Sequence, residues 1–212
     1  MCRTLLLATS NPGKIGELRV LLGGDIRVVS LKDVDVRMPV ETGETFRANA
    51  ELKAVSAAAQ SGLIALADDS GLEVDALEGR PGVRSARFAG VNASDEENRA
   101  RLHDALQAIQ PTSSKARFVC AVSVAVPDGS VWTEFGTLEG QITHEERGRF
   151  GFGYDRMFEL PDGRTLAEVP PDQKNRISHR GRAMSKAVPR LLGMLNVTDL
   201  PAGSPERQGH RS

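Results

Sequence analysis

Residues 63–71 read Leu63-Ile64-Ala65-Leu66-Ala67-Asp68-Asp69-Ser70-Gly71, a short apolar run that ends in two carboxylates, a hydroxyl and a glycine. Five consecutive apolar residues predict a strand buried on both faces, as in a sheet flanked by helices. Neighbouring side chains of a strand point to opposite faces, so both aspartates reach one point only if the chain turns, and Ser70-Gly71 offers that turn. We expect one aspartate to face a site at the carboxyl end of the strand and the other to brace it. An ordinary acidic turn is the alternative.

The composition suits one sizeable globular domain, because 40% of the 212 residues are hydrophobic. The 27 basic and 28 acidic residues give a net charge of -1, which offers no electrostatic case for binding nucleic acid or a membrane surface. Cys2 and Cys120 have neither metal-ligand nor disulfide-framework spacing, which fits a reducing compartment. No run is long enough to span a bilayer or to act as a signal peptide. We therefore expect a cytoplasmic protein with no nucleic-acid or membrane partner.

A polar turn joins a strand to a helix near the start of the chain. Residues 4–8 predict a buried strand, and apolar residues at helical spacing follow as far as Leu22. Between them lies the turn Thr9-Ser10-Asn11-Pro12-Gly13-Lys14, in which Ser10 or Asn11 can cap the helix. Free amide groups and the helix dipole attract an anion there, and Lys14 adds a full positive charge. The turn predicts a phosphate site, with a merely capped helix start as the alternative.

Strands and helices alternate in the first half of the chain, and a hairpin dominates the second half. Residues 25–31 predict a strand, Thr45 begins a helix that runs to about Ser61, and a capping box at Ser94 begins another that runs to about Ile109. Residues 117–126 and 131–136 predict a hairpin that lies far from any signal of chemistry. This order predicts an α/β protein with a mixed, twisted central sheet flanked by helices.

An unusual loop follows the hairpin, Gly148-Arg149-Phe150-Gly151-Phe152-Gly153-Tyr154-Asp155, in a chain that is only 4% aromatic. Glycines let aromatic rings approach a flat ligand closely, and stacking on a nucleobase is worth ~1–3 kcal/mol per base in single-strand binders. The loop therefore predicts a base-binding surface. A glycine-rich bend whose aromatic rings fill the core is the alternative.

Cations gather in residues 174–182, between two helices near the end of the chain. Pro170 and Pro171 suit the start of the first helix, and Ser178 can cap the second. Arg180 and Arg182 oppose the dipole of that second helix, which costs stability unless an anion or acceptor lies nearby. Residues 198–212 have almost no apolar side chains and predict a flexible tail.

Acids and cations of this kind are compatible in one site if a divalent metal joins them. Mg²⁺ takes one or two carboxylates, keeps several waters and binds phosphate oxygens. The sequence therefore predicts a nucleoside triphosphate site with Mg²⁺. The residues that point to it are the acids Glu41, Asp68 and Asp69, together with Lys14 and the cations of residues 174–182.

The sequence also resembles the non-canonical purine nucleoside triphosphate pyrophosphatases, known as inosine or xanthosine triphosphate pyrophosphatases. The resemblance runs from Leu5 to about Leu195 and rests on separated motifs at residues 8–14, 41–43, 49–54, 67–72, 81–83, 151–155 and 177–181. It implies a single domain of residues 1–197 with two lobes, a nucleotide cleft between them, and usually a homodimer. The implied activity is Mg²⁺-dependent cleavage of ITP, dITP and XTP to the monophosphate and pyrophosphate.

The resemblance also assigns roles to particular residues. Glu41 and Asp69 hold the metal, Asp69 is in addition the assigned proton acceptor, and the sequence leaves open whether it acts as base, ligand or both. The implied substrate-binding residues are Thr9, Ser10, Asn11, Pro12, Gly13 and Lys14 for the phosphates, Ser70 for the nucleotide, Phe152, Gly153, Tyr154 and Asp155 for sugar and base, and Lys174, His179 and Arg180 for the purine. A related pyrophosphatase for pyrimidine or modified triphosphates and a non-enzymatic nucleotide sensor are the competing interpretations.

Overall fold

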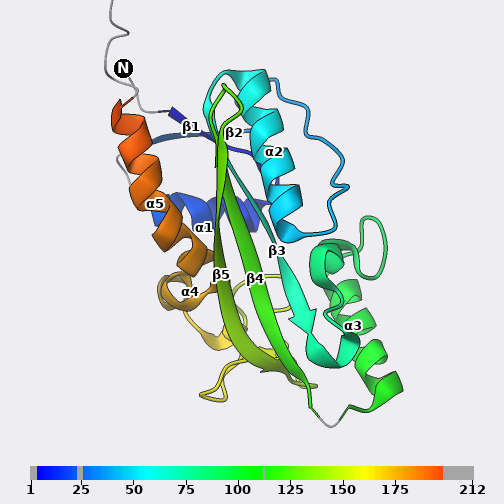
Figure 1. The fold of residues 1–212 in the computed structure, drawn as a ribbon. Coiled ribbons are helices and arrows are strands. Elements are labelled where there is room, and N and C mark those ends of the chain that lie inside the picture. Colours follow the sequence, from blue (N-terminus) through cyan, green and yellow to red (C-terminus); the bar gives the residue numbers. More distant parts are fainter. Residues whose placement is uncertain (1–3, 23–25, 112, 198–212) are drawn as a thin grey trace, which may run out of the picture.

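The computed structural model describes residues 4–22, 26–111 and 113–197. Within these residues, six strands form one sheet in the order β2-β1-β3-β4-β5-β6 (Figure 1). The strand β1 pairs in parallel with β2 and β3, whereas the remaining pairs are antiparallel, so the predicted mixed sheet is confirmed. The strands are β1 (Thr4–Leu7), β2 (Arg27–Ser30), β3 (Ile64–Val74), β4 (Lys115–Ala125), β5 (Val131–Ile142) and β6 (Phe158–Glu159).

Helices cover both faces of this sheet, with α2 on one side of the long strands and α5 on the other (Figure 1). The α-helices are α1 (Pro12–Leu22), α2 (Phe46–Ser61), α3 (Asp95–Ile109), α4 (Pro171–Ile177) and α5 (His179–Val197). Short 3-10 turns in the described part of the chain are η1 (Asp75–Leu77), η2 (Gly82–Arg87) and η3 (Leu166–Glu168). None of the helices in the described ranges is long and apolar enough to cross a membrane.

Local capping signals set the helix starts as the sequence predicts. Asn11 Oδ1 accepts hydrogen bonds from the amides of Gly13 and Lys14, at 2.9 and 3.2 Å. Thr45 Oγ1 accepts from the Ala48 amide, and Ser94 forms the predicted capping box of α3. Each of these signals acts within one helical turn, which is why sequence alone reveals it.

The alternation of side chains along β3 divides the core between the two faces. Ile64 and Leu66 pack in a cluster with residues of α1 and α5, whereas Ala65 and Ala67 pack with the alanines of α2. A separate apolar cluster lies at the far end of the long strands and includes Leu72 of β3 together with residues of α3. The same alternation decides where the next two residues of β3, Asp68 and Asp69, point.

The predicted turn at Ser70-Gly71 is wrong, because β3 continues without interruption to Val74 and pairs with β4 throughout. Gly71 serves a close approach instead. A Cβ atom at this position would lie 2.4 Å from both the Gly82 carbonyl oxygen and Ser85 Oγ, so η2 can pack on the strand only where there is no side chain. Residues 72–74 are therefore the end of β3, and η1 follows them directly.

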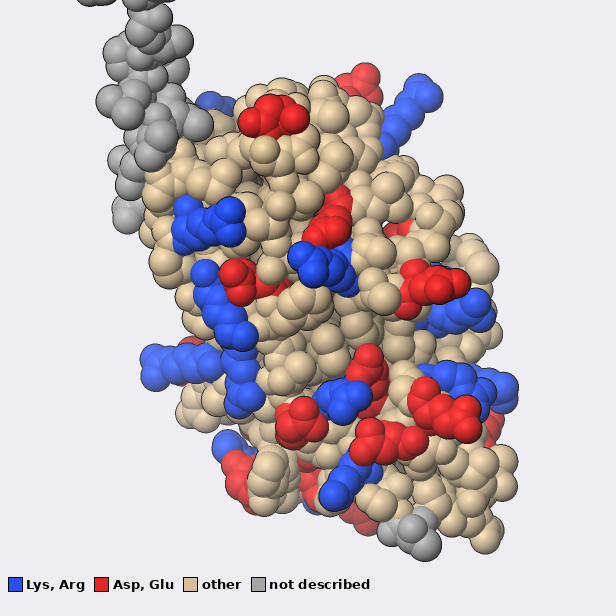
Figure 2. Space-filling model, viewed as in Figure 1, with Lys and Arg blue, Asp and Glu red and all other residues tan. Residues whose placement is uncertain are grey.

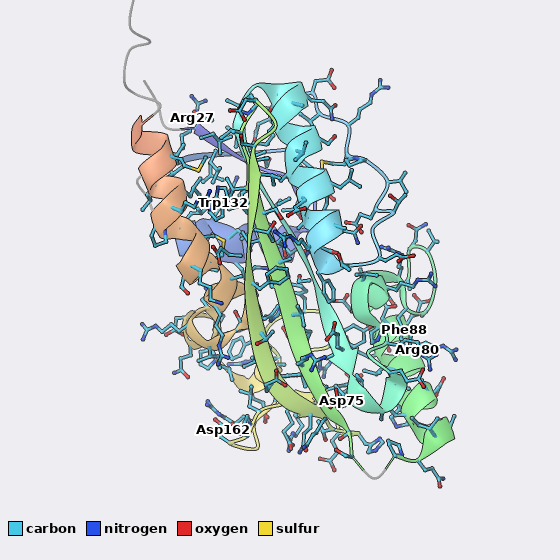
Figure 3. The ribbon with its side chains drawn as sticks, viewed as in Figure 1. Arg27, Asp75, Arg80, Phe88, Trp132 and Asp162 are labelled. Atoms are coloured by element: carbon cyan, nitrogen blue, oxygen red, sulfur yellow. The ribbon has the colours of Figure 1, made fainter. Side chains whose placement is uncertain are left out.

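Acidic and basic side chains are interspersed over the face seen in Figure 2, in keeping with the net charge of -1. On the α5 side of the sheet, Trp132 lies between β5 and α5 (Figure 3). Its indole N–H donates to Met194 Sδ at 3.2 Å, and the Arg190 guanidinium lies 4.6 Å from its ring centroid. These contacts stabilise the packing of α5 against the sheet. The predicted tail of residues 198–212 lies outside the described residues.

Candidate active site

A pocket of about 360 Å³ lies between the middle of β3, the start of α1, η2, the loop 151–155 and the start of α5. It brings together segments from the whole length of the chain. Of the site residues expected from the sequence, those that line it are Thr9, Asn11, Lys14, Glu41, Asp69, Ser70, Phe152, Gly153, Tyr154, Asp155, Lys174, His179 and Arg180. Ser10, Pro12 and Gly13 belong to the same turn as Asn11 but do not line the pocket.

The two adjacent aspartates point to opposite faces of the sheet. Asp68 faces α1 and α5, where its Oδ2 lies 3.0 Å from Lys14 Nζ and 3.1 Å from Arg180 Nη2. Asp69 faces α2, where its Oδ2 accepts from Asn49 Nδ2 at 3.1 Å and its Oδ1 lies 3.5 Å from Lys53 Nζ. One aspartate therefore lines the pocket and the other holds its cations, as expected, although this follows from strand alternation rather than from a turn.

The surroundings shift the pKa values of these two carboxyl groups in opposite directions. Complete burial would raise the pKa of Asp68, but the charges of Lys14 and Arg180 outweigh burial and hold it well below its usual range. Burial raises the pKa of Asp69, because the more distant Lys53 and Lys14 offset it only in part and Glu41 adds repulsion. Asp68 is thus a fixed negative charge, whereas Asp69 is the better proton acceptor of the pair.

Glu41 and Lys53 complete the acidic end of the pocket. Lys53 Nζ lies 2.7 Å from Glu41 Oε1 and bridges it to Asp69, while Arg87 Nη1 lies 3.2 Å from Glu41 Oε2. Burial opposes ionisation of Glu41, but the hydrogen bond from Lys53 and the neighbouring charges hold its pKa below the usual value. Asn49 fixes the preceding loop, because its Oδ1 accepts from the Gly43 amide at 2.8 Å.

These two carboxylates fit a divalent cation such as Mg²⁺. Glu41 and Asp69 both offer carboxylate oxygens at the same end of the pocket, where they share the ammonium group of Lys53. In the ranges that the structure describes, no group of three or more His, Cys, Asp or Glu gathers to hold a metal. Two carboxylates are the number that Mg²⁺ ordinarily takes when phosphate oxygens and waters complete its ligands.

Glu17 connects α1, which carries Lys14, to the cations of the last two helices. It lies one helical turn after Lys14 on α1, and its carboxylate pairs with Lys174 Nζ at 2.9 Å and with the Arg180 guanidinium. Lys174 also lies 2.7 Å from Asp155 Oδ2. Burial would lower the pKa of Lys174, but the charges of Asp155 and Glu17 raise it, so both cations are held charged inside the protein.

His179 presents a neutral, polar ring to the pocket. The ring stacks on Phe118 of β4, with centroids 4.7 Å apart and an interplanar angle of 12°. Burial and the nearby charges of Arg180 and Lys174 lower its pKa well below the usual value. Its Nδ1 is buried and has no hydrogen-bond partner among the residues that the structure describes, an arrangement expected of an atom that meets a ligand.

The aromatic residues of the loop 148–155 divide between pocket and core. The Phe152 ring lies 4.9 Å from Lys174 Nζ, and the Phe152 amide donates to Asp155 Oδ2 at 2.9 Å. Tyr154 is only 4% exposed, and its hydroxyl donates to the Ser85 carbonyl oxygen at 2.8 Å. Phe152 is therefore available for stacking, whereas Tyr154 mainly ties the loop to η2.

Several site residues escape sequence reasoning. The expectation that the hairpin lies far from the chemistry is wrong, because Phe118 on β4 lines the pocket and stacks on His179. Glu17 reads as an ordinary solvated helix residue, since nothing nearby in sequence names its partners. The spacing of Asn49 and Lys53 predicts a shared helix face, but only the fold shows that this face meets Asp69.

A mixed α/β sheet that presents carboxylates, buried cations and an amide-rich helix start to one pocket defines a protein for phosphorylated ligands. The chain belongs to the Ham1 family, whose model matches residues 5–190. It is 50% identical to a dITP/XTP pyrophosphatase of Exiguobacterium sibiricum over 185 residues, which cover 86% of this chain and 93% of the relative. It is 46% identical to a dITP/XTP pyrophosphatase of Cutibacterium acnes over 199 residues, covering 90% and 97%.

Solved structures agree with these sequence matches. A HAM1 protein from Coxiella burnetii is similar with a TM-score of 0.83 and 40% identity, covering 91% of this chain and all of that one. The dITP/XTP pyrophosphatase from Mycobacterium abscessus gives a TM-score of 0.72 and 41% identity, covering 88% and 99%. The family resemblance inferred from the sequence motifs is therefore confirmed.

Proposed function

We propose that this chain hydrolyses the non-canonical purine nucleoside triphosphates ITP, dITP and XTP to the monophosphate and pyrophosphate. Relatives that are named dITP/XTP pyrophosphatases match most of its length at 46–50% identity. The observation that carries the proposal is the opposite tuning of two neighbouring aspartates. Asp68 stays ionised because it pairs with Lys14 and Arg180, which leaves Asp69, with its raised pKa, as the proton acceptor beside Glu41.

At the phosphate end, the amides at the start of α1 and the ammonium groups of Lys14 and Lys53 bind the triphosphate oxygens. Glu41 and Asp69 hold Mg²⁺, which when bound polarises phosphate oxygens and offsets their charge. Asp69 orients the attacking water and accepts its proton. Arg87, paired with Glu41 at the pocket wall, lies where it can contact departing pyrophosphate.

At the opposite end, the purine is recognised by Lys174, Arg180 and the neutral His179, and Phe152 stacks on its face. Cationic donors suit the 6-oxo group shared by hypoxanthine and xanthine. They oppose the 6-amino group of adenine, because two donors would then face each other. Glu17 and Asp68 hold these cations in place before a ligand arrives.

The experiment that tests this proposal is pyrophosphate release over a panel of triphosphates, with and without Mg²⁺. We expect kcat/KM for ITP, dITP and XTP to exceed that for ATP, dTTP and UTP, and activity to disappear when EDTA replaces Mg²⁺. Preference for dTTP or UTP would favour the pyrimidine alternative. Binding without pyrophosphate release in saturating Mg²⁺ would favour a nucleotide sensor.

We further propose a homodimer in the cytoplasm, on the strength of the family resemblance. Light scattering coupled to size exclusion tests the first part directly. A mass near 46 kDa, twice the 22.8 kDa of the chain, is the expected result, and a mass near that of a single chain would contradict it.

A further inference from the structure

The start of α3 forms hydrogen bonds with both the amide and the carbonyl group of Gly153, which lies in the aromatic loop of residues 148–155. The Gly153 amide donates to Asp95 Oδ2 at 2.7 Å, and Arg99 Nη1 donates to the Gly153 carbonyl oxygen at 3.0 Å. Gly153 has a φ of +62°, a backbone conformation that favours glycine. Two charged side chains, one turn apart on the same helix, therefore grip the loop where it bends.

This part of α3 is itself firmly anchored. Arg99 is only 8% exposed, and its Nε donates to Glu146 Oε1 at 2.9 Å. Asn98, 2% exposed, accepts from the Ala89 amide and donates to the Ala86 carbonyl oxygen, which fixes the segment that ends η2. The first two turns of α3 thus hold two walls of the pocket at once.

The position of Gly153 in turn governs Phe152, the residue before it. The Phe152 ring packs against the phosphate-binding turn so closely that a Cβ at Gly13 would lie 2.8 Å from it. On its other side lies Lys174 Nζ, 4.9 Å from the ring centroid. A shift of the loop would therefore move this ring relative to both ends of the pocket.

We propose that Asp95 and Arg99 are positioning residues that set the Phe152 ring for stacking on the substrate base. This inference rests on the proposed function, since it assigns the geometry of the base-binding end to two residues of α3. They act through Gly153, not through the reacting atoms. Loss of either grip weakens binding of the base-bearing part of the substrate and leaves pyrophosphate binding and the chemical step unchanged.

The test compares Asp95→Ala with Glu96→Ala, a matched control. Both residues are exposed acids in the first turn of α3, so both variants lose one charge and the same helix-dipole contribution, but only Asp95 contacts the loop. For each variant we would measure kcat and KM for ITP and the inhibition constants of IMP and pyrophosphate. Asp95→Asn keeps an acceptor oxygen and should recover part of the loss.

For Asp95→Ala we expect KM for ITP and the inhibition constant of IMP to rise about tenfold, the equivalent of one lost charge-assisted hydrogen bond. The inhibition constant of pyrophosphate and kcat should stay within about twofold of wild type, and Glu96→Ala should match wild type throughout. Equal KM values for the two alanine variants would overturn the inference, as would a parallel rise for pyrophosphate.

A second variant covers the case in which Asp95→Ala does not fold. Arg99→Lys keeps the positive charge but loses the forked geometry, and it should produce the same selective rise for IMP. If wild type cleaves no triphosphate, the proposed function fails. Calorimetric titration with IMP would then still test the hydrogen bonds to the loop, with equal affinities for wild type and Asp95→Ala overturning the inference.

Discussion

The substitution Asp68→Asn keeps the size of the side chain but removes its negative charge from a site with no access to solvent. Asp68 is fully buried, with Lys14 Nζ at 3.0 Å and Arg180 Nη2 at 3.1 Å. Removing one partner of a buried ion pair costs about 3–5 kcal/mol. Because Arg180 keeps Glu17, we expect the lower end of this range, about 3 kcal/mol.

The assay is urea unfolding monitored by circular dichroism, together with thermal unfolding. A loss of about 3 kcal/mol corresponds to a fall in Tm of roughly 6–12 °C for a chain of this size. The matched control is its neighbour Asp69→Asn. Burial raises the pKa of Asp69, so its charge stabilises nothing, and we expect that variant to lie within about 1 kcal/mol of wild type.

The pH dependence follows from the same pKa shifts. The folded-state pKa of Asp68 is depressed, so its contribution to stability is complete above the unfolded pKa of about 3.9 and is lost as pH falls further. The difference between wild type and Asp68→Asn should therefore be constant near neutral pH and shrink below about pH 4. A loss under about 1 kcal/mol for Asp68→Asn, or an equal loss for Asp69→Asn, would refute the reasoning.

Three further predictions concern the pocket. Lys53→Met removes the ammonium group that bridges the two proposed metal ligands, Glu41 and Asp69. It should therefore tighten Mn²⁺ binding to the nucleotide-free protein, measured by electron paramagnetic resonance. Unchanged or weaker binding would contradict the idea that Lys53 and the metal compete for these carboxylates. Burial raises the pKa of Asp69 in the metal-free protein, so NMR titration of its carboxyl group without Mg²⁺ should give a midpoint above 3.8, and a midpoint below that value would contradict the shift. Gly13→Ala should raise KM for ITP, because its Cβ would meet the Phe152 ring at 2.8 Å. Gly16→Ala, which has open space on the same helix, should leave KM unchanged and stabilise the protein by about 0.5–1 kcal/mol. Equal KM values for the two variants would count against the position of the ring.

Sequence reasoning succeeds for features that a few neighbouring residues decide. The caps at Asn11, Thr45 and Ser94 lie within one turn of the amides that they bind, so their residue types and spacing suffice. The apolar run before Asp68 likewise predicts a buried strand, because no other element buries so short a run on both faces as readily.

The errors arise where a residue serves a segment that is distant in sequence. Gly71 has the appearance of a turn former, but its role depends on η2 packing against β3. Phe118 reads as one more apolar strand residue, and only the packing of α5 against β4 places it under His179. Glu17 has no local signal at all, since both of its partners belong to the last two helices.

The central claim is that Asp69, beside cations that hold a purine triphosphate, drives cleavage between the α and β phosphates. The most direct test is phosphorus NMR of ITP and Mg²⁺ incubated with wild type and with Asp69→Asn. We predict IMP and pyrophosphate as the sole products of wild type, and intact ITP with the folded variant. Formation of IDP and inorganic phosphate, or turnover by Asp69→Asn at the wild-type rate, would contradict the claim.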